Sequence, residues 1–256
     1  MGVAASIIDR ASGLFLFIYI ARNLSKEITG EFALIMTVSG ALLLLSGLGF
    51  PTVLTSFIPK YLNTRLAQVL STIKVAKIIN VIMSIILLVV FFVFTDEISK
   101  YITLTDHGYG NLKIQALATA TVFEILTQLN IGILIGFECI KQVFKLRLLK
   151  LVLIFFGAIS CLYFFGYIGI YISWIAATLI VYMISELYSF EEVKDYKRAL
   201  SVSNIGLERS IWSLALPVYF SALITQPAIL SSRFILKDSS ASFSGLASFS
   251  AAGKIQ

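Results

Sequence analysis

Long apolar stretches, separated by short charged clusters, run along the whole chain. Stretches without Asp, Glu, Lys or Arg extend for 28 residues at 32–59, for 18 at 78–95 and for 23 at 210–232. A helix needs about 20 apolar residues to cross a hydrocarbon core of about 30 Å. Each of these stretches therefore predicts one membrane-spanning helix.

Two further apolar stretches contain very few charges. Residues 114–137 contain only Glu124, and residues 2–21 contain only the adjacent Asp9 and Arg10. Both are long enough for one crossing. The stretch at 2–21 has no basic residues ahead of it and no small-residue cleavage site, so a retained helix is favoured over a signal peptide.

The longest charge-free stretch, 151–185, has 35 residues, which is too long for one crossing. Glycines inside it favour a tight turn near 165–169 and hence a helical hairpin. Lys145, Arg147 and Lys150 lie at the start of its first helix, and we expect them to extend back to the membrane interface from which that helix starts.

The pattern predicts an all-α, polytopic transmembrane bundle of about seven helices with the start of an eighth. The predicted helices cover roughly residues 3–22, 32–58, 75–95, 113–137, 146–165, 168–188 and 210–231. The longest polar segment then divides the chain into three parts: a first six-helix bundle at 1–188, a cytoplasmic linker at 189–209, and the beginning of a second bundle at 210–256. The basic residues of the linker are also compatible with a helix that lies in the headgroup layer.

Lys and Arg alternate between the connections in a way that predicts orientation. The second, fourth and sixth connections hold 12 of these residues, and the odd-numbered connections hold 6. Because basic connections stay in the cytoplasm, we expect a multi-pass protein of the cell membrane with a cytoplasmic N-terminus.

Composition supports this interpretation and excludes several classes of protein. The chain is 58% hydrophobic and only 13% charged, unlike a soluble domain. Its net charge of +6 comes from clusters between apolar stretches, so a nucleic-acid partner is not expected. Cys139, Cys161 and the single His107 do not form a metal motif. Without a nucleotide-binding loop or a nucleophile triad, neither an enzyme nor a cofactor is indicated.

Glu124 is the main candidate for a functional residue. At helical spacing it shares a stripe with Thr121, Thr127 and Gln128, which gives this span one polar face. A charge at the bilayer centre costs at least about 2.5 kcal/mol and is usually functional. A carboxylate that faces a cavity and binds a sugar hydroxyl, a proton or Na⁺ fits this pattern as well as a buried structural residue does.

Asp9 and Arg10 are the other charged candidates within a span. As neighbours on a helix they project about 100° apart and cannot form a simple pair. Arg10 is placed to meet a substrate diphosphate or Glu124. The alternative, which the closeness of both residues to the chain start favours, is that they reach back to the cytoplasmic interface.

Several segments together resemble one family of membrane proteins. They are ARNLSKEITGEFAL at 21–34, SGLGFPTVLTSFIPKY at 46–61, GILIGFECIKQVFKLRLLK at 132–150, LPVYFSALITQ at 216–226 and FSGLASFSAAGKI at 243–255. In order and spacing they resemble the polysaccharide biosynthesis, or O-antigen flippase, family. That family belongs to the multidrug/oligosaccharidyl-lipid/polysaccharide exporter superfamily.

The resemblance implies a transporter that moves a polyprenyl-diphosphate-linked oligosaccharide across the membrane, in contact with membrane lipids. It also implies about twelve to fourteen helices in two pseudo-symmetric bundles, with the substrate pathway between them. This chain supplies one bundle and the start of another, so we expect the remaining C-terminal bundle or a partner half. A cation-coupled antiporter of small molecules and drugs with the same fold, and a membrane remnant that does not transport, are the alternatives.

Overall fold

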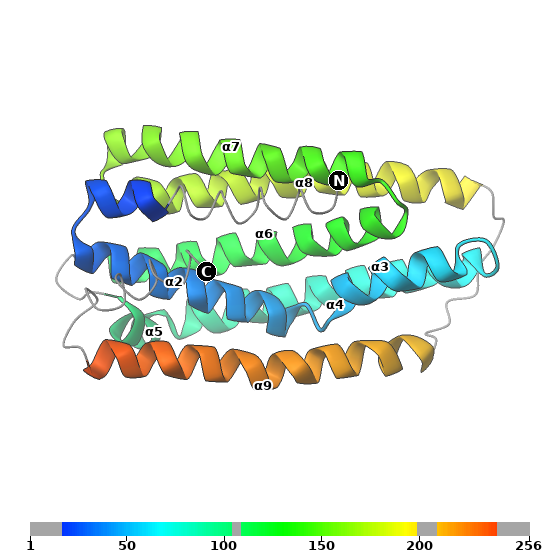
Figure 1. The fold of residues 1–256 in the computed structure, drawn as a ribbon, viewed down its shortest axis with the longest axis horizontal. Coiled ribbons are helices and arrows are strands. Elements are labelled where there is room, and N and C mark those ends of the chain that lie inside the picture. Colours follow the sequence, from blue (N-terminus) through cyan, green and yellow to red (C-terminus); the bar gives the residue numbers. More distant parts are fainter. Residues whose placement is uncertain (1–16, 104–108, 199–208, 240–256) are drawn as a thin grey trace.

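The computed structural model describes residues 17–103, 109–198 and 209–239, and the regular structure in these ranges is entirely helical. Residues 17–23 are helical. The helices that follow are α2 (Lys26–Ser46), α3 (Phe50–Tyr61), α4 (Leu66–Val93), α5 (Thr95–Ile102), α6 (Gly110–Gly136), α7 (Ile140–Phe165), α8 (Ile168–Arg198) and α9 (Arg209–Ser239). Figure 1 shows most of them aligned along one long axis. The predicted all-α bundle is confirmed.

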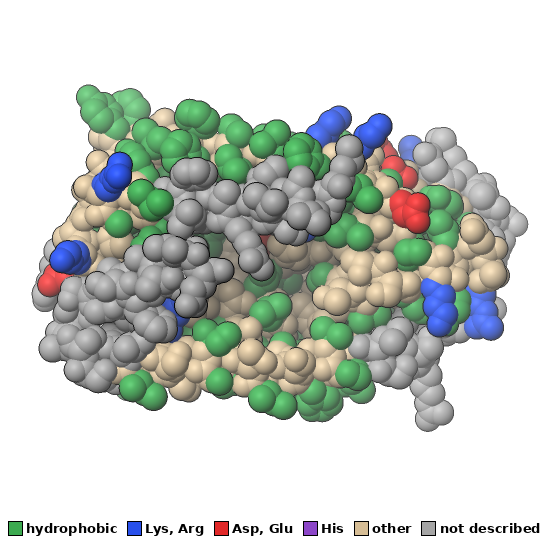
Figure 2. Space-filling model, viewed as in Figure 1, with side chains coloured by type: hydrophobic (Ala, Val, Ile, Leu, Met, Phe, Trp, Pro, Cys, Tyr) green, Lys and Arg blue, Asp and Glu red, His purple; other side chains and the backbone are tan. Residues whose placement is uncertain are grey.

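Six helices in the described part of the chain are long and apolar enough to cross a membrane. They are α2, α4, α6, α7, and the segments Ile168–Lys194 of α8 and Ala215–Ile235 of α9. The exterior is apolar as well: α4, for example, exposes about half of the Ile82, Ile85 and Val89 side chains. In Figure 2, apolar side chains cover much of the long sides and charged ones lie toward the two ends. This is the surface of a multi-pass membrane protein.

The prediction of a single helix at 32–58 is wrong, because the structure divides this segment into α2 and α3. Leu48 and Gly49 adopt left-handed backbone angles, with φ of +49° and +72°, which an α-helix cannot continue through. Pro51 then lies in the first turn of α3, where its missing N–H does not matter. The helix is therefore interrupted within the predicted span, between Ser46 and Phe50.

The hairpin predicted near 165–169 is confirmed. α7 ends at Phe165 and α8 begins at Ile168. Gly166 has a φ of +62°, and its carbonyl accepts a hydrogen bond of 2.9 Å from the Gly169 backbone N–H. Two antiparallel helices therefore replace the single 35-residue apolar stretch.

Helix α6 lies at the centre of the bundle. It contacts α2, α3, α4, α5, α7 and α8, and it has the largest buried share of any of the six spans. Its buried apolar side chains contribute to all three hydrophobic clusters of the core, for example Leu117, Leu129 and Leu134. Polar side chains on α6 thus meet neighbours on several sides.

The connections that are rich in Lys and Arg share one end of the molecule. In Figure 1, the α3–α4 and α6–α7 connections lie at the right, with the end of α8 and the start of α9. Helix α8 continues to Arg198, so residues 189–198 of the segment predicted as a linker are helical. The division into two bundles and the cytoplasmic orientation of this end remain predictions.

Candidate functional site

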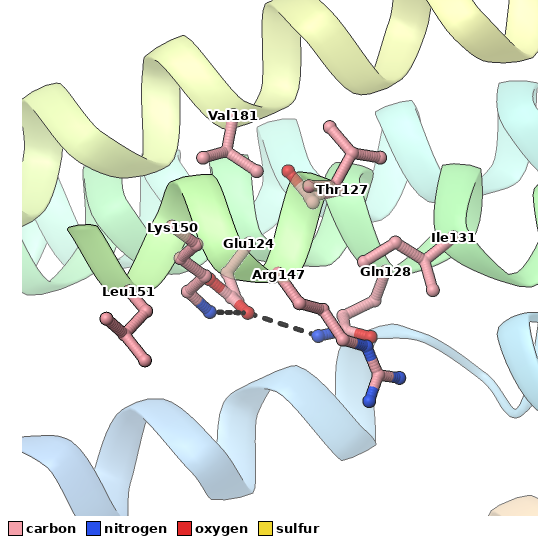
Figure 3. Close-up of a pocket in the computed structure, with 9 residues that line it drawn as sticks. Glu124, Thr127, Gln128, Ile131, Arg147, Lys150, Leu151 and Val181 are labelled. Carbon is pink, nitrogen blue, oxygen red and sulfur yellow. Dashed lines mark hydrogen bonds and ion pairs between the residues drawn. The ribbon is translucent and has the colours of Figure 1, made fainter. Parts of the chain in front are cut away.

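Glu124 forms an ion pair with a lysine on the neighbouring helix. The short connection at 137–139 folds α7 back along α6, which brings Lys150 opposite Glu124. Lys150 Nζ donates to Glu124 Oε1 at 2.5 Å. The Gln128 side chain, one helical turn further along α6, donates from Nε2 to the same oxygen at 3.1 Å. Figure 3 shows Lys150 and Gln128 approaching the carboxylate from opposite sides.

These three side chains line a cavity of about 180 Å³ between α6, α7 and α8. The lining is Glu124, Thr127, Gln128, Ile131, Leu146, Arg147, Lys150, Leu151 and Val181. Two cationic side chains, both from α7, thus share the cavity with one carboxylate. The arrangement can bind an anion at the cationic side and hydroxyl groups at the carboxylate and amide.

The ion pair is enclosed but still accessible. The side chains of Glu124 and Lys150 are 12% and 26% exposed. A lone charge in the membrane interior is costly, and a partner offsets that cost. Pairing explains how α6 carries a carboxylate in the middle of an apolar helix, and the remaining exposure keeps the pair within reach of a ligand.

Two of the predicted candidates, Glu124 and Gln128, therefore lie together, whereas Thr121 lies elsewhere. The Thr121 hydroxyl is buried and shares a hydrogen bond of 2.8 Å with the Ser39 hydroxyl of α2. Thr121 thus joins α6 to α2 and is not among the residues that line the cavity. Asp9 and Arg10 lie outside the described residues.

Lys150 and Arg147 are the side chains that sequence reasoning missed at this site, because they were expected at the membrane interface. A signal for Lys150 was present in the chain. Glu124 precedes the helix connection at 137–139 by 13 residues, and Lys150 follows it by 11, so two antiparallel helices bring them to the same level.

A second ion pair joins α2 to α6 in the interior. Lys113 Nζ donates to Glu31 Oε1 at 2.7 Å and to Oε2 at 2.9 Å, and both side chains are fully buried. The Lys113 ammonium also lies 5.1 Å from the centre of the Tyr167 ring, which adds a cation–π contact. Neither residue lines the cavity at Glu124, so we assign this pair to the packing of α2 on α6.

A third pair lies between α4 and α8. Lys77 Nζ donates to Glu186 Oε1 at 2.7 Å, and Asn130 of α6 donates to Glu186 Oε2 at 2.9 Å. The side chains of Lys77 and Glu186 are 27% and 40% exposed. The pair is similar in chemistry to Lys150–Glu124 but does not contribute to the lining of the same cavity.

Gln128 also lines a second cavity, of about 250 Å³, where α9 lies against the break between α2 and α3. A Cβ atom on Gly49 would lie 3.1 Å from the Ala215 carbonyl oxygen and 3.2 Å from Val218 Cβ of α9. The backbones of the α2–α3 break and α9 therefore approach closely beside the polar cavity. In the described part of the chain, no group of three or more His, Cys, Asp and Glu side chains is placed to hold a metal ion.

Comparison with known proteins gives two matches. A family model described as polysaccharide biosynthesis protein matches residues 3–255. Among solved structures, the chain is similar to an "Inward-facing conformation of a multidrug resistance MATE family transporter of the MOP superfamily", with a TM-score of 0.68 and 18% identity. At this identity the likeness establishes the fold alone. The match covers 98% of this chain and 57% of that one, so the chain spans little more than half the transporter's length. No curated protein sequence matches significantly.

Proposed function

The chain belongs to the polysaccharide biosynthesis protein family, and from this membership we propose that it transports a polyprenyl-diphosphate-linked oligosaccharide across the cell membrane. The observation that carries the proposal is the cavity at Glu124, where cationic and hydrogen-bonding side chains meet inside an apolar bundle. A substrate that combines a sugar with a diphosphate needs both kinds of group.

Each part of such a substrate has a suitable environment. The diphosphate meets Lys150 and Arg147, and charge-assisted hydrogen bonds to phosphate oxygens are strong. Sugar hydroxyls meet Glu124 and Gln128, which accept and donate hydrogen bonds. The polyprenyl tail stays in the bilayer, so the protein must solvate only the polar part.

In this proposal, transport requires a second helical bundle in addition to the one described here. Transporters of this kind commonly alternate access by moving one bundle against another around a central site. Helix α9 packs on α2 and α3 and, in our interpretation, begins the second bundle. The remaining helices come from a C-terminal bundle or from a partner half. The energy source is an ion gradient or the supply of substrate, because the sequence has no nucleotide-binding motif.

We further propose that the end with the basic connections faces the cytoplasm. Lys60 in the last turn of α3, Arg65 just before α4 and Lys141 at the start of α7 belong to elements that meet at this end. They follow the positive-inside rule, and they also offer cationic groups to an anionic lipid-linked substrate.

A drug or small-molecule antiporter is the second candidate, and the similar solved structure is of a multidrug resistance transporter. An antiporter of apolar drugs would be favoured by an apolar, aromatic-rich cavity without cationic side chains. The cavity at Glu124 instead contains Lys150 and Arg147, and none of its lining residues is aromatic. The lining therefore supports the anionic glycolipid over an apolar drug.

The test is deletion of the gene in its native strain and complementation with the full coding sequence. We expect deletion to abolish a surface polysaccharide and to cause its lipid-linked precursor to accumulate, and complementation to restore both. Loss of drug resistance with normal polysaccharide would identify the antiporter instead. No change in either property would identify a membrane protein that does not transport.

A further inference from the structure

A charged pair lies on the apolar exterior of the bundle, between α4 and α8. Lys77 Nζ donates to Glu186 Oε1 at 2.7 Å, and the two side chains are 27% and 40% exposed. Exposed apolar side chains flank the two residues along their helices, namely Ile78, Val81 and Ile82 on α4 and Met183 and Leu187 on α8. Because α9 packs on α2 and α3, we expect the second bundle on that side and lipid at the α4–α8 side.

Both members of this pair lie at the depth of the lipid headgroups. Lys77 directly precedes the charge-free stretch at 78–95, and Glu186 directly follows the one at 151–185. At 1.5 Å per residue, Lys77 is about 24 Å from the far end of α4 and Glu186 is about 27 Å from the far end of α8. Both lengths approach the hydrocarbon thickness of about 30 Å. The pair therefore lies where the hydrocarbon core ends, toward the end of the molecule with the basic connections.

The Glu186 carboxylate is held in place by α6 and keeps room for a ligand. Asn130 Nδ2 donates to Glu186 Oε2 at 2.9 Å, and it also lies 3.1 Å from the hydroxyl oxygen of Ser185. A carboxylate offers about four acceptor positions, of which Lys77 and Asn130 take two. The exposed part of Glu186 can therefore accept hydrogen bonds from a donor outside the protein.

The cationic side of the pair also keeps binding capacity. The Lys77 ammonium has three N–H donors, and the contact with Glu186 takes one of them. Lys74 is exposed one helical turn away on the same side of α4, toward the end with the basic connections. An anionic group at this place thus meets two cationic side chains and has a carboxylate beside it.

The arrangement matches a headgroup that carries a phosphate and a primary ammonium. The phosphate fits Lys74 and Lys77, and the ammonium fits Glu186, since both contacts are charge-assisted hydrogen bonds. Phosphatidylcholine has a quaternary ammonium without N–H donors, and phosphatidylglycerol presents neutral hydroxyls to the carboxylate instead of a cation. We propose that Lys74, Lys77 and Glu186 form a binding site for the headgroup of phosphatidylethanolamine. This inference goes beyond the proposed function and does not depend on it.

The experiment is a lipid titration of the full-length, delipidated protein in detergent, followed by native mass spectrometry. The probes are phosphatidylethanolamine, phosphatidylcholine and phosphatidylglycerol with identical acyl chains. The fraction of protein with one bound lipid gives a dissociation constant for each probe. We expect phosphatidylethanolamine to bind about two- to fivefold more tightly than either of the other lipids, the range for one exposed ion pair.

Three variants locate the site. Glu186→Gln removes the partner of the ammonium and leaves the two lysines, so phosphatidylglycerol should become the tightest of the three lipids. Lys74→Met removes a partner of the phosphate and should weaken phosphatidylethanolamine and phosphatidylglycerol alike. Glu191→Gln is the matched control, because it makes the same change at an exposed carboxylate elsewhere on α8, and it should keep the original order of affinities.

Several results would overturn the inference. These are equal binding of phosphatidylethanolamine and phosphatidylcholine, a preference for phosphatidylethanolamine that persists in Glu186→Gln, and tightest binding of phosphatidylglycerol by the unchanged protein, which would identify a site for anionic headgroups. Size-exclusion profiles show whether each variant is folded. If Glu186→Gln does not fold, Lys74→Met decides, since unchanged lipid affinities in that variant would place the lipid elsewhere.

Failure of this inference is separable from failure of the proposed function, because the lipid titration contains no cargo. Equal lipid affinities in a protein that restores surface polysaccharide reject the lipid site and keep the transport proposal. A preference for phosphatidylethanolamine in a protein that does not restore polysaccharide supports the lipid site and rejects the proposed cargo.

Discussion

Lys113 and Glu31 form an ion pair that is fully enclosed between α6 and α2, with Nζ 2.7 Å from Oε1. Removing one partner of such a pair leaves a buried charge and costs about 3–5 kcal/mol, whereas replacing both can be nearly neutral. We expect Lys113→Met to lower the melting temperature of the purified protein by about 6–20 °C.

The double variant Lys113→Met with Glu31→Gln should recover much of that loss. Lys77→Met is the matched control, because Lys77 and Glu186 are partly exposed and the loss should be smaller. Equal melting temperatures for Lys113→Met and Lys77→Met would contradict the assignment of Lys113 to a buried structural pair.

The close approach of the α2–α3 break to α9 gives a second prediction. Gly49→Leu places a side chain at a φ of +72° and against the Ala215 carbonyl and Val218. We expect a loss of stability of about 1–3 kcal/mol from backbone strain alone, together with displacement of α9. A disulfide cross-linking assay between α3 and α9 and the melting temperature measure the two effects.

Gly40→Ala is the control for Gly49→Leu. Gly40 lies within α2, and a Cβ atom there would meet nothing within 4 Å. The substitution should raise stability by up to about 1 kcal/mol, since alanine favours a helix interior. If Gly49→Leu is as stable as Gly40→Ala, α9 does not contact the break as described.

Cys139 provides a prediction about pH. Burial, and then the nearby Glu192 carboxylate, raise the pKa of the Cys139 thiol from an ordinary value of 9.0 to about 12. The thiolate is the reactive form, so Cys139 in a Cys161→Ser background should react slowly with maleimide at pH 7–9. Glu192→Gln should lower the pKa and speed the reaction.

The same shift has a consequence for stability. A thiol whose pKa is higher in the folded than in the unfolded protein contributes stability below about pH 9, and this contribution is lost as pH rises from about 9 toward 12. The unfolded protein is the reactivity control. Equal maleimide rates for folded and unfolded protein at pH 8 would contradict the partly buried position of Cys139 beside Glu192.

Much of the fold could be predicted because the bilayer imposes strict length limits on apolar segments. The 35-residue stretch at 151–185 had to divide, and its glycines marked the place. The break at Leu48 and Gly49 was missed because the surrounding residues are apolar and no charge interrupts them. Hydropathy counts detect crossings, but they do not detect a left-handed backbone inside one.

The candidate site was predicted only within one helix. Glu124 and Gln128 are four residues apart on α6, so their contact follows from helical spacing. Lys150 was missed because partners on different helices depend on the relative register of those helices. Thr121 lies apart from them because a polar stripe on a central helix is wide enough to face two neighbours, and its hydroxyl meets Ser39 of α2.

The predicted role of Arg10 is open to a direct test. If Arg10 and Glu124 both serve the substrate pathway, the double variant Arg10→Met with Glu124→Gln should reduce export of surface polysaccharide at least tenfold at equal protein level. Lys26→Met is a suitable control, since it changes a basic residue at the start of α2. Unchanged export in the double variant would remove both residues from the pathway.

The central claim is that the Lys150–Glu124 cavity is the transport site, and one measurement tests it most directly. Surface polysaccharide and its lipid-linked precursor are quantified in the native strain carrying Lys150→Met or Lys77→Met, at equal membrane abundance. Both substitutions remove a lysine that pairs with a glutamate in the bundle. We predict at least a tenfold loss of polysaccharide with precursor accumulation for Lys150→Met and near-normal levels for Lys77→Met; equal levels in the two strains would contradict the account.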